Sequence, residues 1–233
     1  MNTDKEFNLE NDSPIYDITK FTHLDYPEHL AAIIWFSGCN MRCDYCYNRD
    51  IVFAKKGTIT MHEALEFLRS RIGLLDGVVL SGGEATAHEL VAFCQAIKEM
   101  GFAIKLDTNG TNSQELYKLL NLDLLDYVAL DYKAPQDKFT HITHSRKYDE
   151  FSKSLDMLIA SGVAFEVRTT LHADLLSPAD INTIIQDLEN RGYTNSYYIQ
   201  EFVETKTNIA ALKKATQSFD KAALISKLDI IWR

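Results

Sequence analysis

Proline and glycine, which interrupt helices and strands, are scarce in this sequence, with 4 prolines and 10 glycines among 233 residues. Neither a low-complexity linker nor a repeat at a fixed period is visible, and hydrophobic residues make up 46% of the chain. A chain of this length and composition can bury one large core. We therefore predict a single domain over residues 26–233, preceded by an N-terminal extension over residues 1–25.

Long apolar runs and an excess of positive charge are also missing. No apolar stretch reaches the roughly 20 residues that a transmembrane helix needs, and no run of Lys or Arg is longer than a pair. The formal net charge of −9 disfavours a broad basic surface for nucleic acid. The segment Met1–Asp12 lacks the basic region and apolar core of a secretory signal. These absences predict a cytoplasmic protein that binds neither a membrane nor a nucleic acid.

Cysteine is rare as well, but three of the 4 cysteines stand close together as Cys39-x-x-x-Cys43-x-x-Cys46. Such tight spacing in a chain that reads as cytoplasmic favours a metal site over disulfides. Three thiolates can hold three irons of a [4Fe–4S] cluster and leave the fourth iron open to a small molecule. The competing interpretation is a zinc site, which needs a fourth ligand such as His62 or His88.

Short β-rich runs alternate with amphipathic stretches along most of the chain. The predicted strands are Ala31–Ser37, Gly77–Ser81, Ala103–Thr108, Tyr127–Tyr132, Ala164–Thr170 and Tyr197–Phe202. The predicted helices are Met61–Ile72, His88–Met100, Ser113–Leu120, Tyr148–Ser161, Pro178–Arg191 and Asn208–Leu228. Strand–helix repetition is typical of parallel strands joined by crossover helices. The fold class is therefore α/β, either a doubly wound sheet or an incomplete barrel.

Start and stop signals support several of these helices. Thr60 and Ser177 are suited to N-caps, and Ser177 is followed by a proline at the first helical position. Gly101 and Gly162 follow helices as stop residues.

Polar residues recur where the predicted strands end. Cys39 follows the first strand, Ser81–Glu84 the second, Asp107–Gly110 the third and Asp131–Lys133 the fourth, while Arg168 lies near the end of the fifth. Both α/β architectures gather such residues at the carboxyl ends of the strands. Gly, Asn and Asp are also common turn residues for steric reasons alone. Their recurrence beside the cysteines favours one active site.

The cysteine motif, with the aromatic Tyr45 before its last cysteine, resembles the cluster motif of the radical S-adenosylmethionine (SAM) enzymes. Gly82-Gly83-Glu84 after the next strand resembles the second hallmark of that superfamily. The resemblance covers nearly the whole chain. It implies an incomplete (β/α)6 TIM-like barrel of parallel strands that binds one [4Fe–4S] cluster, through Cys39, Cys43 and Cys46, together with SAM.

A closer resemblance is to the activating enzymes of glycyl-radical enzymes. Asp107–Gly110 and Leu130–Lys133 are similar to segments of the pyruvate formate-lyase activating enzymes. Ile18–Pro27 and Glu166–Thr170 are more similar to the activating proteins of anaerobic ribonucleoside-triphosphate reductase. Ala85 departs from the family, because a proline usually follows the Gly-Gly-Glu motif. No insert with additional cysteines is present, so one cluster is expected.

This resemblance implies a function. The chain is expected to cleave SAM reductively at its cluster, to produce a 5′-deoxyadenosyl radical, and to install a glycyl radical in a partner, with anaerobic ribonucleotide reductase as the leading partner and a flavodoxin or ferredoxin as reductant. One alternative is a radical SAM enzyme acting on a small molecule, similar to 7-carboxy-7-deazaguanine synthase. Another is a cysteine-ligated metal-binding module without catalysis.

The resemblance also assigns residues to SAM. Tyr45 is expected near the adenine, and Glu84 with the backbone of Ser81–Gly83 near the ammonium group, which needs acceptors once it is desolvated. Asp131 and Lys133 lie two apart on a strand and therefore share a face. They suit a zwitterion with a ribose, or else form a structural ion pair.

A second set of expectations concerns charge. Asp107, Thr108 and Asp131 resemble a monovalent-cation site beside SAM. Arg168 is expected to meet SAM or to close the barrel through Glu84. No catalytic side chain beyond the cluster and cofactor ligands is predicted.

Overall fold

The structure is a computed structural model and describes residues 13–233. Its centre is one eight-stranded sheet in which the strands follow each other in chain order. The strands are β1 (Ile15–Thr22), β2 (Ala31–Phe36), β3 (Gly77–Gly82), β4 (Ala103–Thr108), β5 (Tyr127–Asp131), β6 (Ala164–Leu171), β7 (Tyr197–Glu201) and β8 (Ile230–Trp232). β1 pairs with β2 antiparallel, and every later pair is parallel. β1 and β8 form the two edges, so the curved sheet stays open as an incomplete barrel, which confirms the predicted fold class.

The six predicted strands are β2 to β7, each within two residues of its expected ends. β1 and β8 were not predicted. β1 lies in the segment that the sequence analysis treated as an extension, and its exposed and half-buried residues hide any simple alternation. β8 has only 3 residues, too few to carry a pattern.

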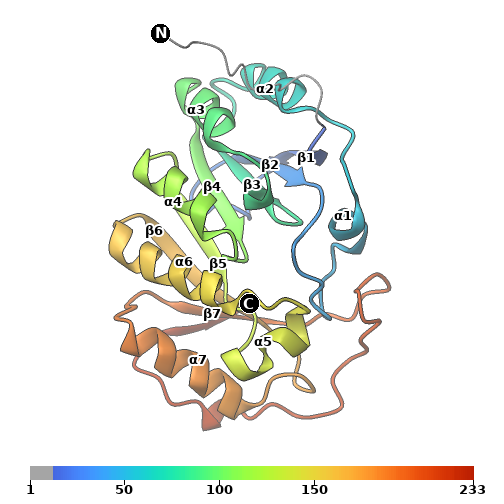
Figure 1. Cartoon of the computed structure of the whole chain (residues 1–233), viewed down its shortest axis with the longest axis vertical. Helices are drawn as coiled ribbons and strands as arrows, with labels where there is room; N and C mark the ends of the chain where they lie inside the picture. Colours follow the sequence, from blue (N-terminus) through green and yellow to red (C-terminus); the bar gives the residue numbers. More distant parts are fainter. Residues whose placement is uncertain (1–12) are drawn as a thin grey trace.

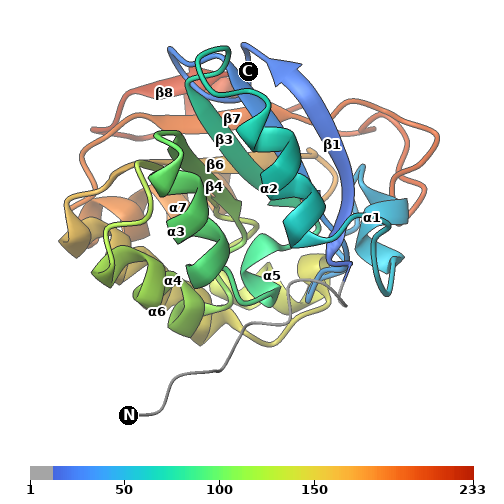
Figure 2. The same cartoon turned by 90° about the horizontal axis from the view of Figure 1, so that it is seen from above.

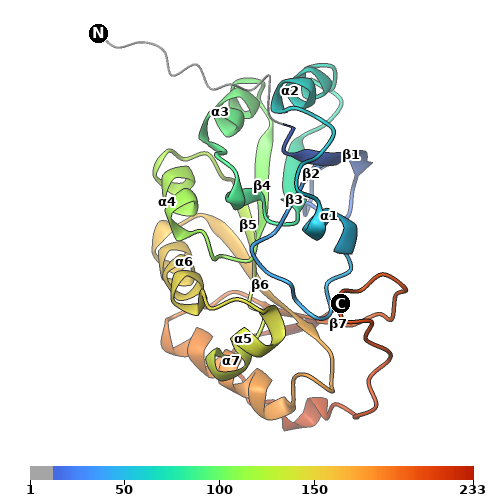
Figure 3. The same ribbon diagram turned by 45° about the vertical axis from the view of Figure 1, so that its right-hand side comes forward.

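Helices cover the outer face of the sheet. They are α1 (Arg49–Phe53), α2 (Met61–Arg69), α3 (Val91–Glu99), α4 (Ser113–Asn121), α5 (Gln136–Thr143), α6 (Tyr148–Ser161) and α7 (Pro178–Asn190), with short 3₁₀ turns η1 (Ala85–Ala87) and η2 (Lys221–Ala223). Figure 1 and Figure 3 show α2, α3, α4 and α6 following one another around the outside of the strands. Seen from above, the same helices form a layer beside the sheet (Figure 2). None of the helices in residues 13–233 is both long and apolar enough to cross a bilayer.

Three of the predicted helix signals are confirmed. Thr60 caps α2 through a reciprocal capping box with Glu63, and Ser177 caps α7 in the same way with Asp180. Both boxes satisfy backbone N–H groups that have no partner inside the helix. Gly162 ends α6 in the left-handed conformation that glycine adopts without a steric cost.

The predicted helix over residues 208–228 is wrong, because this segment is irregular apart from η2. Polar side chains, one within the segment and one outside it, bind backbone groups that a helix would need. The amide of Asn208 donates to the carbonyl of Leu212 (3.0 Å) and accepts from its N–H (2.6 Å). The carboxylate of Asp174 accepts from the backbone of Thr216. Such local bonds compete with helix formation.

The two faces of the sheet differ in polarity. The outer face and the helices share a large apolar cluster that includes Ile34, Leu80 and Leu130. The inner face has a small apolar group at one end of the strands, around Ile33 and Val79. Charged side chains of β4, β5 and β6 also lie on this face, among them Lys105, Asp131 and Glu166. Since buried charges are costly unless paired, the inner face is where function is expected.

Candidate functional site

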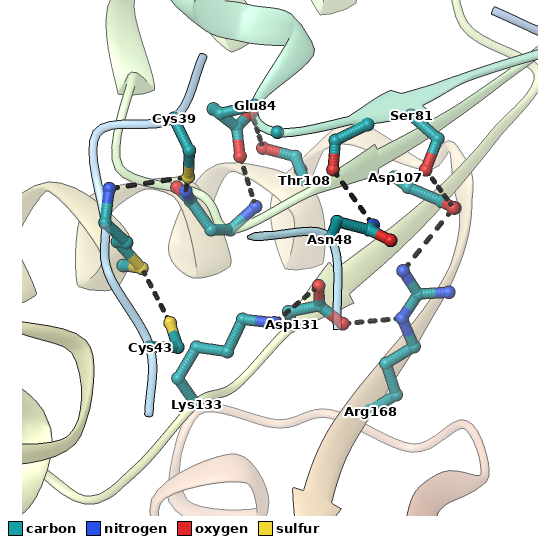
Figure 4. A pocket seen from close by; sticks show the side chains of 14 residues that line it. Cys39, Cys43, Asn48, Ser81, Glu84, Asp107, Thr108, Asp131, Lys133 and Arg168 are labelled. Atoms are coloured by element: carbon teal, nitrogen blue, oxygen red, sulfur yellow. Dashed lines mark hydrogen bonds and ion pairs between the residues drawn. The ribbon is translucent and has the colours of Figure 1, made fainter. Parts of the chain in front are cut away.

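A polar pocket lies at the carboxyl ends of β3 to β6, beside the loop that follows β2 (Figure 4). It brings together most of the predicted site residues, which come from segments far apart in the sequence. Its lining consists of Cys39, Met41, Cys43, Asn48, Ser81, Gly82, Gly83, Glu84, Asp107, Thr108, Asn109, Asp131, Lys133 and Arg168. Of the predicted residues, Tyr45 and Cys46 lie outside this lining.

The cysteine loop, residues 39–46, is fixed by backbone hydrogen bonds. The N–H of Cys46 donates to the carbonyl of Cys43 (3.0 Å), which makes a tight turn between the last two cysteines. The N–H groups of Arg42 and Asp44 donate to carbonyls at the end of α5, at 2.9 and 3.1 Å. The loop is therefore anchored to the opposite side of the pocket.

A second anchor is a segment from the far end of the chain, residues 202–217, which we call the C-terminal segment. The N–H groups of Ile209 and Ala210 donate to the carbonyls of Cys46 (3.2 Å) and Asp44 (3.0 Å). The ring of Phe202 stacks on that of Tyr47, with 5.6 Å between the ring centroids. Figure 3 shows this segment running beside the cysteine loop.

The cysteine side chains are soft sulfur ligands that are largely shielded from solvent. Burial raises the pKa of Cys39 to about 11 and that of Cys43 to about 12, so both are neutral thiols without a metal. Iron binding would deprotonate them. The backbone N–H of Met41 donates to the sulfur of Cys39 (3.4 Å), as expected for a thiolate ligand. Three cysteines on one short loop fit an iron–sulfur cluster.

The histidines proposed as a fourth zinc ligand have other environments. His88 Nε2 is bonded to the carbonyl of Ser37 at 2.9 Å, and its ring packs on Phe36. His62 is exposed at the start of α2. Within residues 13–233, no three His, Cys, Asp or Glu side chains gather as ligands of a single metal ion.

Gly82, the last residue of β3, and Gly83 pack closely against the backbone of β2 and of the residues that lead into the cysteine loop. Gly82 has φ 117°, and a Cβ there would lie 2.4 Å from the nitrogen of Phe36. A Cβ on Gly83 would lie 1.8 Å from the carbonyl oxygen of Gly38, directly before the first cysteine. Only glycine allows this approach. The Gly-Gly motif therefore sets the position of Cys39.

Glu84 is buried and binds the protein itself. Its carboxylate accepts hydrogen bonds from the hydroxyls of Thr86 (2.6 Å) and Thr108 (2.7 Å) and from the N–H of Asn109 (2.7 Å). Burial raises its pKa, and these donors oppose that effect. Glu84 thus joins the turn after β3 to the turn after β4. Its role toward the SAM ammonium stays a prediction.

Arg168 binds aspartates on β4 and β5 and not Glu84, which corrects one expectation. Its Nε donates to Asp131 at 2.5 Å, and its Nη2 lies 3.5 Å from Asp107 (Figure 4). Lys133 donates to the other oxygen of Asp131 at 2.9 Å. The register explains the choice, because Asp131 and Arg168 are directly opposite on β5 and β6.

Electrostatics keep this network ionised. Burial alone would raise the pKa of Asp131, but Arg168 and then Lys133 lower it to about 2. The pKa of Asp107 is also lowered, against burial, by Arg168 and Lys105. Lys105 is 3% exposed and donates to Asp107 at 2.6 Å. Two carboxylates and three cations leave one positive charge, so the protein's own side chains balance both aspartates.

The remaining predicted residues border this network. Ser81 donates its hydroxyl to Asp107 at 3.1 Å. Thr108 follows Asp107 on the strand and therefore points to the other face, toward Glu84. Tyr45 is buried, and its hydroxyl donates to the carbonyl of Lys133 at 3.2 Å.

Sequence reasoning missed three polar side chains of the site. Lys105 alternates with Asp107 along β4, so a period of two could have placed it on the inner face. Asn109 stands in the segment that resembles the activating enzymes but had no assigned role. Asn48 lines the pocket and lies 3.4 Å from the carbonyl of Gly82. Neither asparagine could be found from a periodic spacing in the sequence, because each belongs to an irregular loop.

Comparison with known proteins yields matches over most of the chain. The profile of the Radical SAM superfamily matches residues 33–188. A provisionally named glycyl-radical enzyme activating enzyme of Methanocaldococcus jannaschii is 32% identical over 195 residues, which is 79% of this chain and 78% of that protein. The pyruvate formate-lyase-activating enzyme of Clostridium pasteurianum is 30% identical over 154 residues, covering 61% of this chain and 63% of that enzyme.

Solved structures share the fold at low identity. The structure of anSMEcpe with bound AdoMet has a TM-score of 0.57 at 16% identity and covers 71% of this chain and 48% of that one. QueE from Escherichia coli has a TM-score of 0.52 at 17% identity, with 81% and 84% covered. The chain thus spans about half the length of anSMEcpe and most of QueE.

Proposed function

This chain belongs to the radical SAM superfamily and, within it, to the activating enzymes of glycyl-radical enzymes, and from that premise we propose that it installs a glycyl radical in anaerobic ribonucleoside-triphosphate reductase. The superfamily implies a [4Fe–4S] cluster and SAM. Membership in an enzyme family also sets aside the alternative of a metal-binding module without catalysis. The partner and the residue roles below are our proposal.

Cys39, Cys43 and Cys46 would hold the cluster. When bound, the reduced cluster and SAM supply the chemistry, because one electron delivered to the sulfonium releases methionine and a 5′-deoxyadenosyl radical that takes a hydrogen atom from glycine. The protein's own task is to fix the cysteine loop and to hold a zwitterion beside it. Gly83 and the C-terminal segment do the first by backbone contact.

The observation that carries the proposal is the charge network next to the cysteines. Asp131 and Lys133 present a carboxylate and an ammonium side by side, and Arg168 connects them to Asp107. A preorganised site that carries both signs of charge suits the ammonium and carboxylate of the amino-acid moiety of SAM and its ribose hydroxyls. Glu84 and Tyr45 are proposed to lie near the ammonium and the adenine, as the family resemblance implies. A monovalent cation near Asp107, Thr108 and Asp131 belongs to the proposal, although Lys105 and Lys133 already balance the charges.

The choice of partner rests on sequence. Ile18–Pro27 and Glu166–Thr170 are more similar to activating proteins of the anaerobic reductase than to those of pyruvate formate-lyase. A flavodoxin or ferredoxin would deliver the electron, and the reaction would take place in the cytoplasm. A small-molecule substrate, as in enzymes similar to 7-carboxy-7-deazaguanine synthase, is the second candidate.

The test is anaerobic reconstitution with iron and sulfide, followed by incubation with SAM, a reductant and the purified reductase. We expect 5′-deoxyadenosine to form and a glycine-centred doublet to appear in electron paramagnetic resonance (EPR). Cys39→Ala should abolish both, whereas Cys94→Ala should keep them, because Cys94 is buried in the apolar core. Pyruvate formate-lyase in place of the reductase tests the partner, since a doublet there and none on the reductase would reverse the assignment.

A further inference from the structure

Asn109 lies beside the sulfur of Cys39 without belonging to the cysteine loop. It follows β4 and is 5% exposed. Its side-chain nitrogen is 3.8 Å from Cys39 Sγ in hydrogen-bonding geometry and donates its other hydrogen to Asn40 Oδ1 at 2.9 Å. A side-chain amide has two N–H donors, so both contacts can form together.

The orientation of the Asn109 amide is fixed by its oxygen. Asn109 Oδ1 accepts from the backbone N–H of Thr111 (3.0 Å) and from the Thr111 hydroxyl (2.7 Å). A backbone N–H can only donate, so the atom facing it must be the oxygen. The nitrogen therefore has to face the sulfur. The Thr111 hydroxyl also accepts from Asn40 at 2.8 Å, which closes the ring of contacts.

The backbone of Asn109 is held independently of this ring. Its N–H donates to Glu84 at 2.7 Å, and the next N–H, that of Gly110, donates to the Thr108 hydroxyl at 3.0 Å. Through its bond to the backbone of Asn109, Glu84 places the side-chain amide of Asn109 near the sulfur. Gly83 places Cys39 at the same site by close backbone packing. A single turn, the one that follows β3, thus brings the donor and the acceptor together.

We propose that Asn109 is a positioning residue whose side-chain N–H donates to the sulfur of Cys39 and raises the reduction potential of the cluster. This inference rests on the proposed function in one respect only, namely that Cys39 is a cluster ligand. The physical reason is charge. Reduction adds an electron to the cluster and makes the cysteine sulfur a better acceptor, so an N–H donor stabilises the reduced state more than the oxidised one.

The experiment is a potentiometric titration of the anaerobically reconstituted enzyme, followed by EPR. In Asn109→Leu, which removes the donor without adding charge, we expect the ratio of reduced to oxidised cluster at a fixed potential to fall about tenfold, a shift of about 59 mV for a one-electron couple. Iron content should equal that of the wild type. Thr111→Val keeps the Asn109 donor and the backbone N–H that orients it. Its midpoint potential should therefore lie close to that of the wild type. Asn195→Leu removes an exposed amide that donates to the carbonyl of Phe165 outside the pocket, and it controls for the asparagine-to-leucine change itself.

A second measurement does not depend on a stable variant. Wild-type enzyme labelled with ¹⁵N in asparagine side chains should show a weak ¹⁵N hyperfine coupling to the reduced cluster, and Asn109→Leu should lack it. Absence of this coupling in the wild type, or an unchanged midpoint potential in Asn109→Leu at full iron content, would overturn the proposal. Failure of the wild type to assemble a cluster at all would instead refute the proposed function.

Discussion

At position 83 the turn after β3 meets the backbone that leads into the cysteine loop, with no room for a side chain between them. The carbonyl of Gly38 accepts the N–H of Glu84 at 2.9 Å, so the two strands of backbone are bonded as well as packed. The sequence identified Gly82 and Gly83 as a motif, but it suggested approach to a ligand. The structure adds a second task, which is to position Cys39, and the approach of this backbone to SAM stays a prediction.

We predict that Gly83→Ala lowers the free energy of unfolding by about 3 kcal/mol, because the new methyl group overlaps the Gly38 carbonyl. Gly101→Ala is the control. Its Cβ meets no atom within 4 Å, so only the positive φ of 86° opposes it, at about 1 kcal/mol. Urea denaturation measures both values. Equal losses in the two variants would contradict the steric argument, and the iron content of Gly83→Ala should fall further than that of Gly101→Ala.

Asp131 makes stability depend on pH. Its pKa of about 2 in the folded chain lies below the usual 3.8, because Arg168 and Lys133 outweigh burial. The lowered pKa means that its contribution is complete above about pH 4 and is lost as the pH falls toward 2. This contribution of Asp131 to the free energy of unfolding is about 2 kcal/mol. Urea denaturation of the metal-free protein should show that the free energy of unfolding falls more steeply with decreasing pH in the wild type than in Asp131→Asn. Parallel pH dependences in the two proteins would refute the lowered pKa of Asp131.

At the scale of elements, β2 to β7 were predictable because each is a short buried run rich in Val, Ile, Leu or aromatic residues, bounded by turn residues. α1 and α5 were missed, since five and eight residues give a weak period. Residues 208–228 were wrongly predicted as a helix because apolar residues recur at helical spacing there. Their conformation depends on distant partners such as Asp174, which no local pattern reveals.

We predict that Asp174→Ala loosens the C-terminal segment. The carboxylate accepts from the N–H groups of Thr216 and Gln217, at 3.0 and 2.8 Å, and these donors lower its pKa. Hydrogen exchange over residues 205–217 should therefore speed up in the variant at neutral pH. In the wild type the protection of the same amides, taken relative to an unstructured chain at the same pH, should be lost only below pH 3.8, where the carboxylate gains its proton. Asp220→Ala, which removes only the cap of η2, should leave this exchange unchanged.

At the scale of the whole molecule, the open barrel is held across its inner face by ion pairs between strands. Besides the Arg168 network, Arg233 after β8 reaches Glu166 on β6 with two hydrogen bonds of 3.2 and 3.1 Å and stacks on Tyr198 of β7. Tyr127 of β5 donates to the same carboxylate at 3.3 Å. Sequence could place these residues on strands, but it could not pair them, because pairing depends on the curvature of the sheet.

We predict that Arg233→Met costs about 2 kcal/mol of unfolding free energy, since it leaves the buried carboxylate of Glu166 without its cation. The cost is kept below that of a fully buried pair because Arg233 is 40% exposed. Glu166→Gln combined with Arg233→Met should recover part of the loss. If urea denaturation shows Arg233→Met to be as stable as the wild type, the pair does not hold β8 to the barrel.

The bond between the C-terminal segment and the cysteine loop has a consequence for how the protein matures. Residues 209 and 210 leave the ribosome some 160 residues after the cysteines that they help to fix. During synthesis the three thiols are thus exposed on a nascent loop with one of its anchors absent. Delivery of iron and sulfide is therefore best timed after residues 209 and 210 have been synthesised and have folded back onto the cysteine loop.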